Sequence, residues 1–404
     1  MHKPDASDGT RDAFPPSLRA AQDRLRRVQP EAYARTRNHL DGAVTRLSPY
    51  ITHGVLSLDQ VAGYLRDQHG LADGHKLVYE LGWRAYFQHV WRREGQGILR
   101  SLRPGLLRDA DYTNTVPDDI RQARTGLAVI DQAVRTLYAT GYLHNHARMW
   151  LASYLVHMRK VHWRAGADWL YGHLLDGDLG SNHLSWQWVA ATGSTKPYLF
   201  NAENVARHAP PGWHVQGSLL DTDYDALDTW ARQPLAAPAP GEHRLAALPE
   251  TTNEPALLHT PPFALRSASA GELTHAWLVH PWAVRNPCTE AAAPHRKRLG
   301  VFAADFHNAW PWSARRWHFV HAAMREVCDD IVWLEDPPPA SCAYTDNPHL
   351  HMAGKAWPRA HCVPEPLLWP DPAKRCNSFS QYWREVSRTA VPARAHRSVP
   401  LVDA

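Results

Sequence analysis

Polar residues interrupt the apolar stretches of this chain at a few points where side-chain chemistry could occur. Asn145, Arg148 and Met149 share one face of a predicted helix that is otherwise apolar. A buried guanidinium without a counter-charge is very costly, so Arg148 requires a carboxylate. The nearest candidates are Asp176 and Asp178 in the stretch LLDGDLGSNHLSWQW. The pattern indicates either a structural ion pair inside a helical bundle or the polar part of a ligand site.

At two further positions in the sequence, polar residues could have either a structural or a ligand-binding role. Glu80 lies in the apolar stretch LVYELGWRAYF, where it is either a satisfied core carboxylate or an acid that contacts a ligand. Thr45, Arg46, Leu47 and Ser48 follow a loop and precede a predicted helix. Residues in that place either cap the helix or hold a phosphate on its N–H groups.

Tryptophan and histidine are unusually frequent, with 18 and 26 residues. Eighteen indoles exceed what one core needs, because each brings an N–H group that must find a partner. Packing of many short helices, or a bias of the genome, would account for the excess. Stacking on nucleic-acid bases and redox work beside a cofactor are the functional alternatives. Composition does not separate these four explanations.

The composition is that of a globular protein of two or three domains, with 404 residues, 44% apolar and 21% charged. No run of about 18 apolar residues occurs, and the N-terminus lacks the apolar core of a secretory signal. All five cysteines lie at or beyond Cys288 without a C-x-x-C spacing. We therefore expect a cytoplasmic protein with no membrane contact, no bound metal and no iron–sulfur cluster.

The formal charge of +4 is unevenly distributed. Residues 1–210 hold 26 Lys and Arg against 20 Asp and Glu, a net charge of +6, and the remainder has a net charge of −2. The basic bias of the first half fits an anionic partner.

Apolar periodicity predicts a first segment that is almost wholly helical. Helices are expected at 55–67, 75–98, 126–140, 144–160 and 165–175. No long alternating pattern typical of strands occurs before residue 265.

The last segment has a different pattern, which predicts a small α/β domain. Strands are expected within 274–280, 297–305 and 329–336, with a late strand in AHCVPEPLLW. Residues 313–329 are expected to form a helix that Ser313 caps.

Proline density gives the boundary between the two segments. Nine prolines fall in 210–262, against eight in the whole of 1–209, and this stretch shows no apolar periodicity of a core. The expected division is an extension over 1–29, a helical domain over 30–209, a proline-rich connection over 210–264 and an α/β domain over 265–404.

Five strings of the helical segment occur in one order and combine Asn, Arg, Asp and Trp at fixed offsets: TRLSPYITHGVLS, ELGWRAYF, TGLAVIDQAVRTLYATGYLHNHARM, DWLYGHLLDGDLGSNHLSWQW and ATGSTKPYLFN. Together they resemble the FAD-binding helical domain of the photolyase/cryptochrome family. The resemblance covers roughly residues 30–202, half of the chain. It implies a mainly α protein with an all-helical FAD domain, a U-shaped FAD and light-driven chemistry.

The resemblance assigns cofactor contacts to the residues that match family positions. Those matching the contacts of the FAD phosphates and ribityl chain are Tyr33, Thr45, Arg46, Leu47 and Ser48. Those matching positions around the flavin are Arg84, Asn145, Arg148, Asp176, Asp178 and Asn182. Asn182 is expected opposite flavin N5, where an amide can donate or accept as the flavin changes its redox state.

An electron-transfer chain is implied by the same resemblance. Trp186 and Trp163 match its two inner members, whereas the stretch RDADYTNTVP has no tryptophan for the outer one. Tyr112 could substitute, or electrons could leave through Trp91 or Trp150.

The pocket residues resemble those of members that repair cyclobutane pyrimidine dimers in DNA. Such members carry a catalytic acid and pocket side chains at positions that match Glu80, Trp83, Asn145, Met149 and Trp188. The two indoles would stack on a flipped dinucleotide, and Glu80 would bind the pyrimidine edge. We also predict that Arg37 contacts a DNA phosphate.

Members that repair (6-4) photoproducts have histidines at the positions of Asn145 and Met149, and here His144 and His146 only flank them. The alternative function is a cryptochrome-like photoreceptor that uses FAD without repair. A flavoprotein with dark redox activity is a third, but no nicotinamide fingerprint supports it.

The α/β segment departs from the family order, in which an antenna domain precedes the FAD domain. AWLVHPWAVRNP resembles the family's opening strand, and residues 301–336 resemble its next βαβ unit. We therefore expect an antenna-like domain moved to the C-terminal side. Whether it binds an antenna chromophore is open. We expect a monomer without a protein partner.

Overall fold

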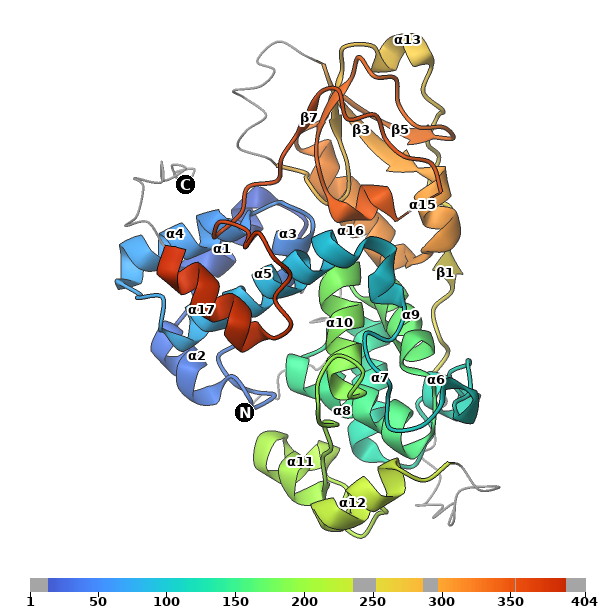
Figure 1. Ribbon diagram of the computed structural model, residues 1–404. Coiled ribbons are helices and arrows are strands. Elements are labelled where there is room, and N and C mark those ends of the chain that lie inside the picture. The colour runs from blue at the N-terminus through green and yellow to red at the C-terminus, as the bar shows by residue number, and fades with distance from the viewer. Residues whose placement is uncertain (1–13, 235–251, 286–296, 353, 390–404) are drawn as a thin grey trace, which may run out of the picture.

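The computed structural model describes residues 14–234, 252–285, 297–352 and 354–389 (Figure 1). The elements of the first half are α1 (Leu18–Arg26), α2 (Pro30–Thr36), α3 (Ser48–Thr52), α4 (Leu58–His69), α5 (Lys76–Glu94), η1 (Gly95–Leu99), η2 (Asp109–Asp111), α6 (Asp118–Arg121), α7 (Ala128–Thr140), α8 (Asn145–Ser153), η3 (Tyr154–Met158), α9 (Trp163–His173), α10 (Leu179–Val189), α11 (Ala202–His208), η4 (Pro211–Trp213) and α12 (Tyr224–Ala231). Those of the second half are β1 (Leu257–Leu258), α13 (Ala270–Leu273), β2 (Trp277–Val279), β3 (Arg298–Ala303), α15 (Ala304–Ala309), β4 (Trp312–Ser313), α16 (Ala314–Arg325), β5 (Asp330–Leu334), β6 (Ala343–Thr345), η5 (Pro348–His351), β7 (Cys362–Val363) and α17 (Phe379–Thr389).

The predicted fold class, a helical domain followed by an α/β domain, is confirmed. The five helices expected from apolar periodicity are present as α4, α5, α7, α8 and α9, with shifted ends. Local signals explain several ends. Ser57 and Gln60 form a capping box at the start of α4. Gly141 ends α7 in the left-handed region at φ 67°. The helix expected to reach residue 160 instead passes from α8 into the single π-helical turn η3.

The second half contains a five-stranded parallel sheet in the order β5-β3-β2-β6-β7. Counted from β2, this order is 3-2-1-4-5, as in doubly wound folds. The predicted strands are present, and Ser313 caps α16 by accepting from Arg316 N. The order reverses between β2 and β6. In such sheets, ligands bind in the crevice beyond the carboxyl ends of the two strands at the reversal.

The expectation of a stretch without core periodicity over 210–264 is wrong for part of it. Asp223 accepts from Ala226 N and starts α12, whose Leu227 and Ala231 are buried. Further on, β1 pairs antiparallel with β4. The sequence analysis missed this short helix because the stretch is rich in proline, although the prolines lie on either side of the helix and none lies within it.

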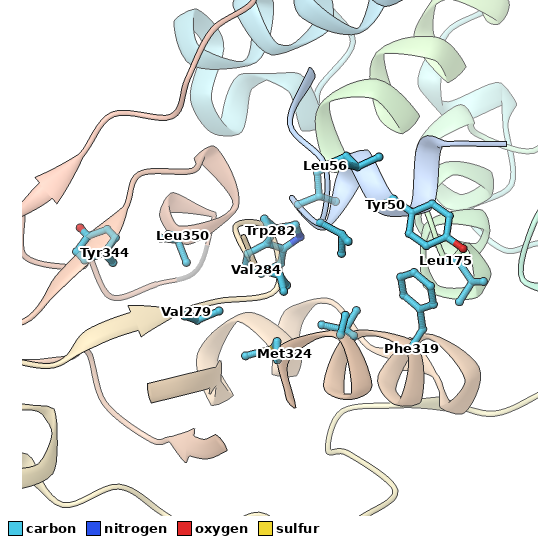
Figure 2. Packing of buried hydrophobic residues seen from close by; sticks show 14 of the residues in the cluster. Tyr50, Leu56, Leu175, Val279, Trp282, Val284, Phe319, Met324, Tyr344 and Leu350 are labelled. Atoms are coloured by element: carbon cyan, nitrogen blue, oxygen red, sulfur yellow. The ribbon is translucent and has the colours of Figure 1, made fainter. Parts of the chain in front are cut away.

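The C-terminal sheet shares one apolar core with the N-terminal helices. Phe319 of α16 packs against Tyr50 of α3 and against His53, both at 5.8 Å between ring centroids. Figure 2 shows this junction, with Trp282 and Val284 beside Leu56. A second core lies within residues 116–227 of the helical half.

Backbone hydrogen bonds also join the two parts. Val284 N donates to His53 O, and Arg285 N donates to Gly54 O. Gly54 has φ 61°, and a Cβ there would lie 3.0 Å from the Ala283 Cα. The close approach of the two segments therefore requires glycine. In the described part of the chain, no helix is long and apolar enough to cross a membrane.

Phe319→Ala tests whether this shared core stabilises the fold. Emptying a buried aromatic site costs about 3–5 kcal/mol, and Phe319 is 5% exposed. We expect a loss of this size in urea-induced unfolding. The control is Phe263→Ala, because Phe263 contacts His321 of α16 and is only half-buried at the border of this core, so a smaller loss is expected there. An equal loss in both variants would contradict the shared core.

Candidate functional site

The centre of the candidate site is the turn between α9 and α10, which carries two carboxylates. Asp176 is an ion-pair partner of Arg148, whose Nη2 lies 2.8 and 2.9 Å from the two carboxylate oxygens. Asp178 caps α10 by accepting from Ser181 N at 2.7 Å. The Asp176 side chain is 3% exposed and that of Arg148 is 22% exposed, so the carboxylate is buried and the pair is mostly shielded from solvent. The sequence-based pairing of Arg148 with Asp176 is therefore present.

Further hydrogen bonds connect these carboxylates with α3 and α5. Ser48 Oγ donates to Asp176 Oδ2 at 2.5 Å, and Thr52 Oγ1 donates to Asp176 O. Burial raises the pKa of Asp176, but Arg148, Ser48 and Arg84 more than offset it and hold the pKa below its usual value. Asp176 is thus ionised near neutral pH.

The Asp178 carboxylate faces α5. Gln88 Nε2 donates to both of its oxygens at 3.0 Å, and Arg84 Nη2 lies 3.8 Å from Oδ2. Arg84 also donates to Thr52 Oγ1. The structure therefore brings together five predicted cofactor residues, which are Ser48, Arg84, Arg148, Asp176 and Asp178.

A second cluster surrounds Glu80. Its carboxylate pairs with Arg37 at 3.2 Å and with Lys76 at 3.3 Å. Tyr33 lies beside it, and burial together with Glu80 raises the pKa of the Tyr33 phenol. Of the two alternatives for Glu80, the structure shows a half-buried carboxylate with partners. Arg37, predicted to contact a phosphate, forms an ion pair within the protein.

Tyr142 lies beside Arg148 of the first cluster, and the sequence analysis did not include it as a site residue. The Arg148 guanidinium lies 5.5 Å and that of Arg46 lies 6.0 Å from the Tyr142 ring centroid. Arg46 adopts the left-handed region at φ 51°. The loop there is further bent by Thr45, whose Oγ1 accepts from the N–H of buried Leu47 at 3.4 Å. Its position directly before the LHNHARM string was the one feature of the sequence that could have indicated a role for Tyr142.

The other predicted pocket residues are placed as follows. Asn145 Nδ2 donates to Met149 Sδ at 3.4 Å on the first turns of α8. Asn182 Nδ2 donates to Ala167 O at 2.8 Å. Trp188 lies 5.8 Å from the Tyr198 ring. The roles of all four predicted residues in binding stay predictions.

Both predicted inner members of the electron-transfer chain are buried. Trp163 Nε1 donates to Ser101 Oγ at 2.9 Å. The Trp186 ring packs over α9, where a Cβ on Gly166 would approach it to 2.4 Å. Tyr112 is linked to Trp163 through His162, at 6.1 and 5.7 Å between ring centroids. Of the alternatives for the outer member, Trp91 packs on His349 and Trp150 on His146.

The indole of Trp83 is stacked against a helix that the sequence analysis missed. The Phe379 ring of α17 lies parallel to it, 4.1 Å away with 10° between the planes. Beside it, the Trp383 ring lies so close to α5 that a Cβ on Gly82 would approach it to 2.5 Å. Figure 1 shows α17 (red) against the N-terminal helices (blue). One face of Trp83 is therefore covered from the far end of the chain.

Arg316 of α16 reaches the turn that carries the two carboxylates. Its side chain is fully buried and donates to the carbonyl oxygens of Tyr171 and Gly177. The guanidinium also lies 4.1 Å from the Trp312 ring centroid and 4.6 Å from that of Tyr171. No local pattern in the sequence could have placed this residue at the site.

Residues 77–215 match the family model described as the FAD binding domain of DNA photolyase. The deoxyribodipyrimidine photo-lyase of Streptomyces griseus is 36% identical over 159 residues, which are 38% of this chain and 34% of that protein. The cryptochrome DASH of Natronomonas pharaonis is 29% identical over 223 residues, 52% of this chain and 44% of that one. A solved bacterial class III photolyase from Agrobacterium tumefaciens has a TM-score of 0.42 at 24% identity, covering 57% of this chain and 58% of that one.

Residues 77–215 therefore match the FAD-binding domain of DNA photolyase, a domain whose cofactor is FAD. The chain spans less than half the length of the curated relatives described above.

Asp176→Asn tests the buried ion pair in the protein without cofactor. Removing one partner of such a pair costs about 3–5 kcal/mol. Because the pKa of Asp176 is depressed in the fold, its stabilisation is present above the unfolded carboxyl pKa and is lost as pH falls through the folded value. We expect lower urea stability at pH 7 and a weaker loss of stability on acidification.

The matched control for this prediction is Glu203→Gln, in the exposed ion pair of Glu203 with Arg207. Exposed pairs contribute at most about 1 kcal/mol. If Asp176→Asn and the control lost the same free energy of unfolding, the Arg148–Asp176 pair would contribute no more to stability than an exposed pair.

Proposed function

We propose that this chain is a light-dependent DNA repair protein that splits cyclobutane pyrimidine dimers. The observation that carries the proposal is the match of residues 77–215 to the FAD-binding domain of DNA photolyase. Glu80, Trp83, Asn145, Met149 and Trp188 support it, since they resemble the pocket of dimer-repairing members. Bound FAD supplies a light-excitable one-electron donor.

The polar groups of the site fit such a cofactor. Arg84 and Arg148 supply donors for phosphate and carbonyl oxygens, and Ser48 Oγ and Asp178 supply acceptors. Among the described residues, His144 Nε2 is a buried atom without a hydrogen-bond partner, and so are Ser181 Oγ and Gln88 Oε1. A bound group with donors and acceptors would satisfy such atoms.

The side chains of the proposed pocket would bind and orient the lesion. Trp83 and Trp188 would stack on the flipped dinucleotide. Glu80 would hydrogen-bond the pyrimidine edge and stabilise negative charge there. The dimer gains one electron, its two inter-ring carbon–carbon bonds break, and the electron returns. The reaction therefore has no net oxidation or reduction, and the two pyrimidines are restored.

A cryptochrome-like photoreceptor is the second candidate function. Two observations favour it: the chain is similar to a cryptochrome DASH, and Phe379 covers one face of Trp83. A photoreceptor does not have to bind a pyrimidine dimer, so the stacking of Phe379 on Trp83 would not impair its function. Repair, in contrast, requires that α17 move or that the substrate use the other face of the indole.

Repair is tested with the reduced protein and an oligonucleotide that contains one thymine dimer, in blue light and in the dark. We expect intact thymines by HPLC after illumination only. Glu80→Ala is expected to retain FAD and to lower the repair yield about tenfold or more, because the pyrimidine edge loses its partner. The control is Glu203→Ala on α11, which has an exposed side chain. No repair despite bound, reduced FAD would favour the photoreceptor.

Phe379→Ala tests whether α17 restricts access to Trp83. Stacking of a base on an aromatic ring contributes about 1–3 kcal/mol, so uncovering Trp83 is expected to tighten binding of dimer-containing DNA about fivefold or more. Fluorescence anisotropy in the dark measures the Kd. Phe263→Ala serves as the control, since Phe263 packs on α16 away from α5. Unchanged or weaker binding by Phe379→Ala would mean that the covered face of Trp83 takes no part in binding DNA.

A further inference from the structure

His183 is a buried titratable residue that directly follows Asn182 on α10. Its side chain is fully buried, and its Nε2 lies 2.8 Å from Oδ1 of Asp168 on α9. Asn182 Nδ2 donates to Ala167 O, also at 2.8 Å. Two adjacent residues of α10 are therefore bonded to two adjacent residues of α9. The bond of His183 fixes the spacing of the two helices at the point where the bond of Asn182 is made.

The Asp168 carboxylate decides which nitrogen of His183 carries the proton. Arg164 Nε donates to both oxygens of this carboxylate, at 2.7 and 2.8 Å, and holds it in place. Burial lowers the pKa of His183 against the opposing effect of Asp168, so the ring is neutral near pH 7 and has one N–H. A carboxylate only accepts, so this N–H is on Nε2. Nδ1 then has a free lone pair, 3.1 Å from Leu179 O and 3.5 Å from Asn182 Nδ2.

These contacts set the direction of the Asn182 amide. The carbonyl of Ala167 and the unprotonated Nδ1 of His183 both only accept, so both face the amide nitrogen. Within the described part of the chain, no group donates to Asn182 Oδ1, which is accessible to solvent. The amide therefore offers a bound group its oxygen, as an acceptor, and keeps its nitrogen turned toward α9.

We propose that His183, held by Asp168, is a positioning residue that keeps the oxygen of the Asn182 amide directed at N5 of the flavin. The inference rests on the proposed function, in which Asn182 lies opposite N5 and the cofactor is reduced. Reduced flavin has a hydrogen on N5 that an amide oxygen accepts. N5 of oxidised flavin has a lone pair instead, which the same oxygen repels. The fixed amide therefore favours the reduced cofactor, the form that repair requires.

His183→Phe is the main test, because it keeps a ring on α10 and removes both nitrogens. A redox titration of the full chain loaded with FAD, followed by absorbance in the dark, measures the midpoint potential of the flavin. We expect the potential to become more negative. The ratio of the affinities for reduced and oxidised FAD should fall about three- to tenfold, the effect of one neutral hydrogen bond. For a two-electron couple, a tenfold fall corresponds to about 30 mV.

Asp168→Ala gives a second measurement, which also decides if His183→Phe fails to fold. The Asp168 side chain is 40% exposed, so its truncation does not empty a site in the core. We expect a shift in the same direction in the wild-type background. In the His183→Phe background we expect no further shift, because Asp168 acts through His183. The control is Asp109→Ala, which removes an exposed carboxylate 3.6 Å from His162 Nε2 and should leave the potential unchanged.

The potential separates positioning from a merely structural role. A variant that weakens the binding of reduced and oxidised FAD equally leaves the potential unchanged. Unchanged potentials in His183→Phe and Asp168→Ala, with FAD bound, would overturn the positioning role and leave the proposed function standing. If the potentials shift as expected but the reduced wild-type chain repairs no dimer, the positioning of the amide stands and only the proposed repair fails.

Discussion

The buried guanidinium of Arg316 is the contact on which the arrangement of the site depends. It comes from α16 of the C-terminal half, yet it donates to carbonyl oxygens at both ends of the 171–177 segment in the helical half. Burial lowers the pKa of Arg316, against the opposing fields of Asp176 and Asp178. The cation is held between the Tyr171 and Trp312 rings. A buried charge is tolerated only with such compensation, so this turn and α16 must keep one relative position.

The carboxylates on that turn organise the rest of the helical site. Asp176 accepts hydrogen bonds from Arg148 of α8 and Ser48 of α3, whereas Asp178 accepts from Gln88 of α5. Three helices far apart in sequence are therefore oriented by two residues that have a single glycine between them. Gly177 has no room for a side chain, because a Cβ there would lie 2.4 Å from an Arg316 nitrogen. The turn thus orients helices of the helical half and contacts α16 of the sheet domain at the same time.

Sequence reasoning reached the contacts that follow from local patterns. Apolar periodicity located the long helices, and the need of Arg148 for a carboxylate predicted its pairing with Asp176. It did not reach Arg316 or Phe379, because their partners lie more than a hundred residues away and depend on how the two halves dock. It missed α12 because prolines dominate the composition around that helix. The resemblance to a family supplied candidate FAD contacts, but it could not show that residues of the C-terminal sheet line a cleft together with Arg84 and Asp178.

The shared core has a consequence for how the protein is made. Ribosomes release the helical half first, and domains generally begin to fold as they emerge. Tyr50 and Leu56 then lack the neighbours that cover them in the finished chain, since Trp282, Val284 and Phe319 are synthesised more than two hundred residues later. During that interval the nascent chain presents an apolar surface suited to a chaperone. The contacts of Arg316 with Tyr171 O and Gly177 O likewise form only after α16 has been synthesised.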